Sequence, residues 1–240
     1  MLSASNIPTP SDSTDYSEPT TCLLLPAFVI IDNVTPTNVP DLISSVVNKA
    51  STSTSLLSGA ANANGHLETE LSDHLKLPSG LSTRSCPRDV VILICSQKTR
   101  DARCGQSAPL LKREFERHLR ALGLYRDTED ERPGGVGIHF ISHVGGHKFS
   151  ANVMIYRRPD FGRRIANHNG NGHVPESAGI TAEEESKAQD LGASQCIWIA
   201  RVRPEDCQGI VKFTVMQGKV VKPERQLRGG FDREKGLCSW

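Results

Sequence analysis

The run Asp89-Val-Val-Ile-Leu-Ile-Cys95 decides the fold class. Its unbroken β-branched and aliphatic residues are typical of a strand covered on both faces in a parallel or mixed sheet. A polar loop at 96–107 follows this run. Apolar residues then recur at helical spacing between Pro109, where we expect a helix to begin, and Gly123, where it ends. The sequence therefore predicts a strand, loop and helix in succession.

Downstream of this unit the pattern predicts a second half of the same sheet. We expect strands at 137–142 and 149–156 joined by a Gly-Gly turn, a polar insertion at 160–194, a strand at 197–202 and a closing helix from Pro204. This element order predicts an α/β protein with a thioredoxin-like mixed sheet and flanking helices. A generic doubly wound sheet is the alternative.

The first 85 residues differ in composition from the rest. They hold 3 Lys/Arg against 8 Asp/Glu and are rich in Ser and Thr, whereas residues 86–240 hold 25 against 19. Within them we expect a buried strand over 23–31 that is interrupted by Pro26, and a weak helix over 39–57 capped by Asp41. The predicted division is a disordered leader at 1–21, an incomplete N-terminal α/β portion at 22–57, a linker at 58–85, the thioredoxin-like domain at 86–225 with its insertion at 160–194, and a tail at 226–240.

Composition excludes several classes of partner. The net charge of the 240 residues is +1, which gives no overall field for nucleic acid or an anionic membrane. The longest apolar run, Cys22 to Ile31, is broken by Pro26 and is too short to span a bilayer. No Lys or Arg precedes Lys49, and the seven cysteines are an odd number without secretory context. We therefore expect an intracellular protein with no membrane span and no nucleic-acid partner.

Two cysteines are candidates for a metal site. Cys95 ends the predicted strand and Cys104 lies in the loop beyond it, at the edge of the sheet where ligands gather in open α/β folds. The loop between them carries Lys98, Arg100 and Arg103, and these cations would favour the thiolate form. They would also attract an acidic redox partner.

Two histidines complete the candidate site. His143 and His147 flank Gly145 and Gly146, which let the backbone turn tightly and approach a cofactor. Two thiolates and two imidazoles suit either tetrahedral zinc or a [2Fe-2S] cluster with two cysteines on one iron and two histidines on the other. The spacing of the four residues leaves both alternatives open.

Four segments together resemble a known family: Leu23-Leu-Leu-Pro-Ala-Phe28, Cys95-Ser-Gln-Lys-Thr-Arg-Asp-Ala-Arg-Cys104, His143-Val-Gly-Gly-His147-Lys-Phe-Ser-Ala-Asn152 and Ile197-Trp-Ile-Ala-Arg-Val202. On these residues the chain resembles the sucrase/ferredoxin-like family, and within it the fungal altered inheritance of mitochondria protein 32 branch of thioredoxin-like [2Fe-2S] ferredoxins. The resemblance implies that Cys95, Cys104, His143 and His147 ligate a [2Fe-2S] cluster, and it favours the cluster over zinc.

The resemblance also implies a function. Replacing two thiolates by neutral imidazoles raises the reduction potential of such a cluster, and an imidazole that loses its proton makes the potential depend on pH. We therefore expect electron transfer or redox sensing, by a carrier more than by an enzyme. The alternative is a zinc-stabilised thioredoxin-like interaction module without redox turnover. A thiol oxidoreductase using Cys95 is disfavoured because no Cys-x-x-Cys pair is present.

The last residues, Leu237-Cys-Ser-Trp240, resemble the terminal tripeptide of cytosolic iron-sulfur proteins. On that interpretation Trp240 is a recognition handle for the iron-sulfur assembly machinery; the alternative is an aromatic side chain packed at a domain edge. The family resemblance implies a mitochondrial location, whereas the tail and the absence of a transit-peptide pattern favour the cytosol.

Overall fold

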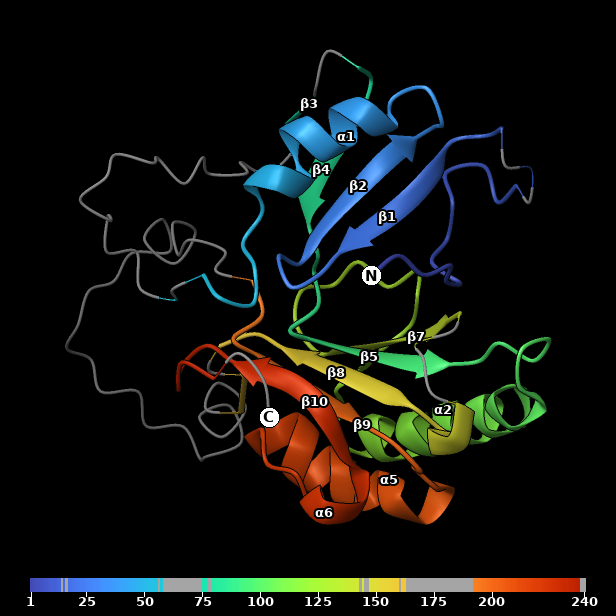
Figure 1. Ribbon diagram of the computed structural model, residues 1–240, viewed down its shortest axis with the longest axis vertical. Helices are drawn as coiled ribbons and strands as arrows, with labels where there is room; N and C mark the ends of the chain where they lie inside the picture. The colour runs from blue at the N-terminus through green and yellow to red at the C-terminus, as the bar shows by residue number, and fades with distance from the viewer. Residues whose placement is uncertain are drawn as a thin grey trace.

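The computed structural model describes residues 1–13, 15, 17–55, 57, 75–76, 79–142, 144, 147–159, 161–162 and 192–237, with Leu75, Lys76 and His147 described in backbone only. Two sheets organise these residues, one of four strands and one of six. Figure 1 shows the smaller sheet above the larger one, with helices beneath the larger sheet.

The larger sheet is mixed, with both parallel and antiparallel strand pairs. Its order is β10 (Leu227–Asp232), β9 (Gln195–Ile199), β8 (Val153–Arg157), β5 (Val90–Cys95), β7 (Val136–Ile141) and β6 (Tyr125–Arg126). Strand β5 pairs parallel with β7 and antiparallel with β8, and β8 pairs antiparallel with β9. The order β9-β8-β5-β7 with these directions is compatible with a thioredoxin-like fold, so the predicted α/β class is confirmed.

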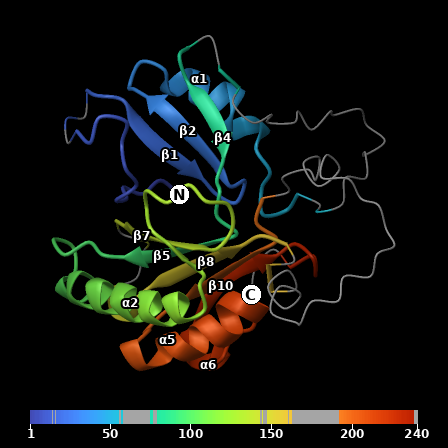
Figure 2. The ribbon, with the colours of Figure 1, turned by 180° about the vertical axis from the view of Figure 1, so that it is seen from behind.

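Every residue of the central strand β5 is buried. Because successive side chains of a strand point to opposite faces, Val90, Ile92 and Ile94 join one core and the alternate residues join another. The first core lies under α2 (Ala102–Ala121) and α5 (Cys207–Gly209) with its π-helical continuation η4 (Ile210–Val215). Figure 2 shows these helices from behind, on one face of the sheet. Full burial of each such aliphatic side chain contributes roughly 2 kcal/mol.

The helix after β5 begins earlier than the sequence predicts. It was expected at Pro109, but α2 begins at Ala102, because the Asp101 side chain accepts the Arg103 N–H at 2.9 Å and caps the helix. Pro109 lies inside the helix, where its missing N–H deprives the Gly105 carbonyl of a donor. The correction places Cys104 in the first helical turn instead of a loop.

The smaller sheet is antiparallel and has its own core. Its order is β1 (Thr20–Leu24), β2 (Val29–Val34), β4 (Ser82–Ser85) and β3 (Leu75–Lys76). The prediction of one strand over 23–31 is wrong: β1 and β2 form a hairpin, and residues 25–28 are its turn. Pro26 has no N–H to offer a strand ladder, and Phe28 turns the chain with a φ of 57°.

The predicted helix over 39–57 is also shorter in the structure. Helix α1 spans Val39–Ser45, with Asn38 and not Asp41 at its cap position, and the 3₁₀ turn η1 spans Val47–Lys49. Strand β4 falls inside the predicted linker at 58–85, so part of that range belongs to the smaller sheet. The division of the chain into domains otherwise stays a prediction.

The described part of the predicted disordered leader contacts the larger sheet. Ser5 forms a β-bridge with Ile141, the Ser142 N–H donates to the Ala4 carbonyl at 2.7 Å, and the Asn6 N–H donates to the Phe140 carbonyl at 3.3 Å. Strand β6 covers only two residues of β7, which leaves the backbone groups of the rest of that edge in need of partners. Over residues 1–13 the structure therefore differs from the expectation of disorder.

Three further expectations concern the later part of the chain. The strand predicted at 197–202 is β9, and the helix predicted from Pro204 begins as the 3₁₀ turn η3 (Pro204–Asp206) before α5. That helix does not close the fold, because β10 follows it within the predicted tail and pairs with β9. The insertion falls mostly outside the described residues, although Phe161 is buried in the core beneath the sheet. Trp240 also lies outside them. No helix among the described residues is long and apolar enough to cross a membrane.

Candidate metal centre

Cys95 is held at the carboxyl end of β5. Its Cα pairs with Ile141 of β7, and its N–H donates to the Asn152 carbonyl at 3.1 Å just before β8. The side chain is 1% exposed and shares the face of Val91 and Leu93, opposite to the helices. Strand pairing on both sides therefore fixes the first candidate ligand.

Cys104 lies in the first turn of α2, and its thiol lies next to that of Cys95. Its side chain is 1% exposed, its thiol contacts the Cys95 thiol, and its Sγ lies 3.3 Å from Ser150 Oγ. Burial raises the pKa of the Cys104 thiol, the hydrogen bond with Ser150 opposes that rise, and the neighbouring Cys95 adds to it. Both cysteines are free of disulfides. The structure thus places the two predicted sulfur ligands in contact with each other.

The histidine segment is described only at its two flanks. His143, Gly145 and Gly146 lie outside the described residues, and of His147 only the backbone is described, in the 3₁₀ turn η2 (His147–Phe149). Val144, however, is 4% exposed and packs in the same cluster as the two cysteines. Ile141 and Ser150, which lie on either side of the undescribed residues, are therefore held beside the two cysteines.

No group of three or more His, Cys, Asp or Glu side chains that could hold a metal is found in the described part of the chain. The full set of Cys95, Cys104, His143 and His147 therefore stays a prediction. One further group fits such a site: Asn152 is 2% exposed, and its Oδ1 has no hydrogen-bond partner among the described residues. A buried acceptor of this kind suits the second N–H of a metal-binding imidazole.

The loop cations do not all face the thiols. Arg103 donates two hydrogen bonds to the Asp101 carboxylate, at 2.9 and 3.1 Å, and its side chain is exposed. Lys98 and Arg100 are also exposed. We expected these cations to favour the thiolate, but the pKa of Cys104 is raised, and burial is the largest cause of that rise.

Gly105 allows the loop to pack against α2. A Cβ on Gly105 would lie 2.5 Å from Lys98 Cβ and 2.9 Å from Lys98 Cα. Because the Lys98 backbone must then shift, we expect Gly105→Ala to lower the free energy of unfolding by about 2 kcal/mol and to speed the reaction of Cys104 with a thiol reagent in the metal-free chain. Urea unfolding and reagent kinetics measure the two effects.

Gly209 in α5 provides the matched control for this prediction. Its Cβ would meet only Val221 Cγ2, at 4.0 Å. Gly209→Ala should therefore leave the thiol kinetics unchanged and raise stability by up to about 1 kcal/mol, through helix propensity. Equal behaviour of the two variants would contradict the packing of Lys98 on Gly105.

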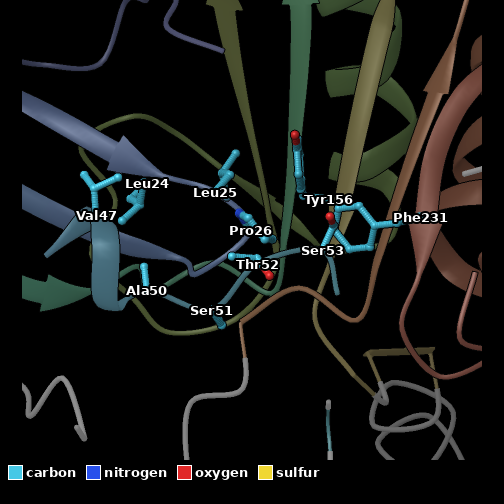
Figure 3. Close-up of a pocket in the computed structure, with 10 residues that line it drawn as sticks. All are labelled: Leu24, Leu25, Pro26, Val47, Ala50, Ser51, Thr52, Ser53, Tyr156 and Phe231. Carbon is cyan, nitrogen blue, oxygen red and sulfur yellow. The ribbon is translucent and has the colours of Figure 1, made fainter. Parts of the chain in front are cut away.

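A pocket of about 410 Å³ lies away from these cysteines, between the two sheets. Figure 3 shows Leu25 and Pro26 of the hairpin turn on one side of it and Tyr156 and Phe231 of the larger sheet on the other. Its lining has no Cys, His, Asp or Glu side chain. The pocket therefore offers no ligand set for a metal.

The sequence profile of the sucrase/ferredoxin-like family matches residues 1–229. The chain belongs to the sucrase/ferredoxin-like family. Over 67 residues the chain is 58% identical to actin patches distal protein 1 of Saccharomyces cerevisiae, a stretch that is 28% of this chain and 21% of that protein. No solved structure matches the chain.

Other relatives align with the chain over longer stretches. Altered inheritance of mitochondria protein 32 of Clavispora lusitaniae is 28% identical over 185 residues, which are 77% of this chain and 50% of that protein. The protein of the same name from Meyerozyma guilliermondii is 30% identical over 134 residues, 56% of this chain and 33% of that protein. In these comparisons the chain spans half or less of its relatives' length.

Sequence reasoning missed three residues that hold the site together. Val144 packs beside the thiols, Ser150 contacts Cys104, and Asn152 accepts from the Cys95 backbone. All three lie within the histidine segment that carried the family resemblance, but neither periodicity nor spacing assigned them a contact. Their partners are far away in the sequence and become neighbours only through the pairing of β5 with β7 and β8.

Proposed function

We propose that this member of the sucrase/ferredoxin-like family holds a [2Fe-2S] cluster through Cys95, Cys104, His143 and His147, and that it acts in electron transfer or redox sensing. The observation that carries the proposal is the meeting of two buried thiols at one edge of the sheet. The anchoring of both flanks of the histidine segment beside these thiols supports it.

The protein's own groups prepare the site in three ways. Burial keeps bulk water from the thiols, which protects thiolate ligands from solvent and from oxidation once they are bound. The Ser150 hydroxyl can donate to the Cys104 sulfur, and such hydrogen bonds to sulfur raise a cluster's potential. The Asn152 Oδ1 offers an acceptor for an imidazole N–H, which would fix the orientation of that ring.

The cluster supplies one-electron exchange, and the mixed sulfur and nitrogen ligands set a potential above that of an all-cysteine ferredoxin. The alternative is a zinc-stabilised module, because two thiolates and two imidazoles also suit tetrahedral zinc. The separation of Cys95 and Cys104 by eight residues is wider than in common zinc knuckles, but spacing alone leaves both alternatives open. The resemblance of the four sequence segments to the family is what favours the cluster.

Electron paramagnetic resonance on the reduced, anaerobically purified protein tests the proposal. We expect a signal of a [2Fe-2S] centre, and we expect His143→Cys and His147→Cys each to change it, because thiolate replaces imidazole on one iron. Spectra that are indifferent to both replacements would remove the histidines from the site. A colourless protein with one equivalent of zinc would establish the alternative.

We further propose that the iron-sulfur assembly machinery recognises Trp240, and that the protein acts in mitochondria or the cytosol. The names of the relatives in Clavispora lusitaniae and Meyerozyma guilliermondii refer to mitochondria, whereas the tail favours the cytosolic machinery. Deletion of Trp240 should lower iron incorporation in cells. Unchanged loading would exclude the handle, and fractionation of cells locates the protein.

A further inference from the structure

An exposed cationic surface surrounds Phe149, and we call it the Phe149 surface. It lies at the same edge of the larger sheet as Cys95, where β8 and β10 begin and β9 ends. Phe149 precedes Ser150, whose hydroxyl contacts the Cys104 thiol. The Phe149 surface consists of Lys148, Phe149, Trp198, Arg201, Arg225 and Arg228.

Arg201 is fixed over the Phe149 ring by its backbone. Its φ is 51°, a left-handed conformation that is uncommon for a residue with a Cβ. The Arg201 N–H donates to the Phe149 carbonyl at 3.0 Å, and Arg201 Nη1 donates to the Arg225 carbonyl at 3.1 Å. Its guanidinium carbon lies 5.2 Å from the centre of the Phe149 ring. These contacts hold the charge at the surface in one place.

Arg228 lies between two aromatic rings on the same surface. Its guanidinium carbon is 3.8 Å from the centre of Phe149 and 4.7 Å from that of Trp198. Burial and the charge of Arg201 lower the pKa of Arg228. Arg228 Nη1 and Trp198 Nε1 are buried and have no hydrogen-bond partner among the described residues. The cations Arg201 and Arg228 thus lie close together, and two N–H donors beside them, on Arg228 and Trp198, have no acceptor among the described residues.

The charges of the Phe149 surface are not balanced by carboxylates. No ion pair within the described residues involves Lys148, Arg201, Arg225 or Arg228. In the adjoining hollow of about 400 Å³, Glu205 and Asp206 are already paired with Arg203 and Lys222, respectively. Holding unpaired cations together costs stability through repulsion, and an anionic partner would recover that cost.

We infer that the Phe149 surface docks an acidic face of a protein partner, and that this partner exchanges electrons with the cluster of the proposed function. Small, polar and charged interfaces are typical of transient redox pairs. The electron-exchange part of the inference rests on the proposed function. The docking part rests on the Phe149 surface alone.

A fluorescein-labelled octaglutamate peptide tests the docking. Its affinity for the full chain is measured by fluorescence anisotropy at low salt, with and without iron loading. The Phe149-surface variant combines Lys148→Gln, Arg201→Asn and Arg225→Gln and so removes three positive charges. Asparagine is chosen at position 201 because it tolerates the left-handed backbone conformation there. We expect binding to weaken about ten-fold in this variant and to weaken in every form when salt shortens the Debye length.

The matched control removes three charges elsewhere. Arg113→Gln, Arg117→Gln and Arg120→Gln change exposed cations on the later half of α2 and give the same net charge. This variant should bind the peptide as the parent chain does. Equal weakening of both variants would show an effect of net charge only and overturn the inference. Displacement of the peptide by inorganic phosphate at matched ionic strength would also overturn it, because it would indicate a site for small anions.

Oxidation of the reduced, iron-loaded protein by ferricyanide tests the electron exchange. One electron passes from the protein to each ferricyanide. The positive potential of the Phe149 surface should steer this trivalent anion toward the cluster without binding it there. We expect a rate about ten-fold lower in the Phe149-surface variant and an unchanged rate in the control. Loss of peptide binding with an unchanged rate would contradict the electron-exchange part. Peptide binding by a chain that takes up no iron would instead refute the proposed function and leave the docking intact.

Discussion

Replacement of Cys104 by serine is expected to abolish iron binding and the visible absorption of the purified protein. The Cys104 thiol contacts Cys95 and is 1% exposed, so a serine in its place would offer a poor ligand in a site closed to solvent. Iron content should fall to below roughly a tenth of the parent value, because loss of one cluster ligand removes an anchor that the remaining ligands cannot replace. Iron analysis and absorption spectroscopy measure this.

Cys22→Ser is the control for that prediction. Cys22 lies in β1 of the smaller sheet and is partly exposed, outside the cluster of side chains that contains Cys95 and Cys104. Its replacement should leave iron content and absorption unchanged. Retention of a full complement of iron by the Cys104→Ser chain would show that this residue is not a ligand, whatever the result for Cys22.

The stability of the protein is expected to fall by about 3 kcal/mol as the pH decreases from 6.5 to about 4, through the single side chain of His139. Burial in β7, and then the positive charges of Arg88 and Lys112, lower the pKa of His139 from 6.5 to about 4. Its Nδ1 is buried without a hydrogen-bond partner among the described residues. Protonation would place a charge and an unpaired N–H in the interior.

Acid lowers the stability of the folded chain because the unfolded chain binds a proton at His139 more tightly. Between pH 4 and 6.5 the unfolded chain binds a proton at His139 and the folded chain does not, so acid favours unfolding. The contribution is complete above pH 6.5 and lost below about pH 4. Urea unfolding of the parent and His139→Leu chains across this range measures it. The difference between the two free energies of unfolding should change with pH, and a constant difference would contradict the lowered pKa.

The sequence predicts the larger sheet well because its strands are covered on both faces. The run that ends at Cys95 is apolar throughout, and it forms β5 with every residue buried. The sequence pattern did not predict the smaller sheet as well, because strands such as Ser82–Ser85 are polar and form through their pairing with β2. Pairing partners distant in the sequence leave no periodic signal in either strand.

The candidate site was also predicted only in part from the sequence. The structure brings together Cys95 and Cys104, which the sequence analysis placed at one edge of the sheet, although Cys104 lies on a helix because of the Asp101 cap. That cap was missed because Pro109 gave a stronger local signal for a helix start. The positions of the His143 and His147 imidazoles stay predictions, and so do the roles of Gly145 and Gly146.

The alternation of side chains along β5 has a consequence for any redesign of this protein. Cys95 shares a face with Leu93 only because the two residues are two positions apart, with Ile94 between them. Deleting one residue from the strand would turn its sulfur toward the helices and bring aliphatic groups to the opposite face. Changes of length in this strand should therefore be more damaging than most substitutions within it, because the proposed metal site depends on the position of each residue along the strand as well as on composition.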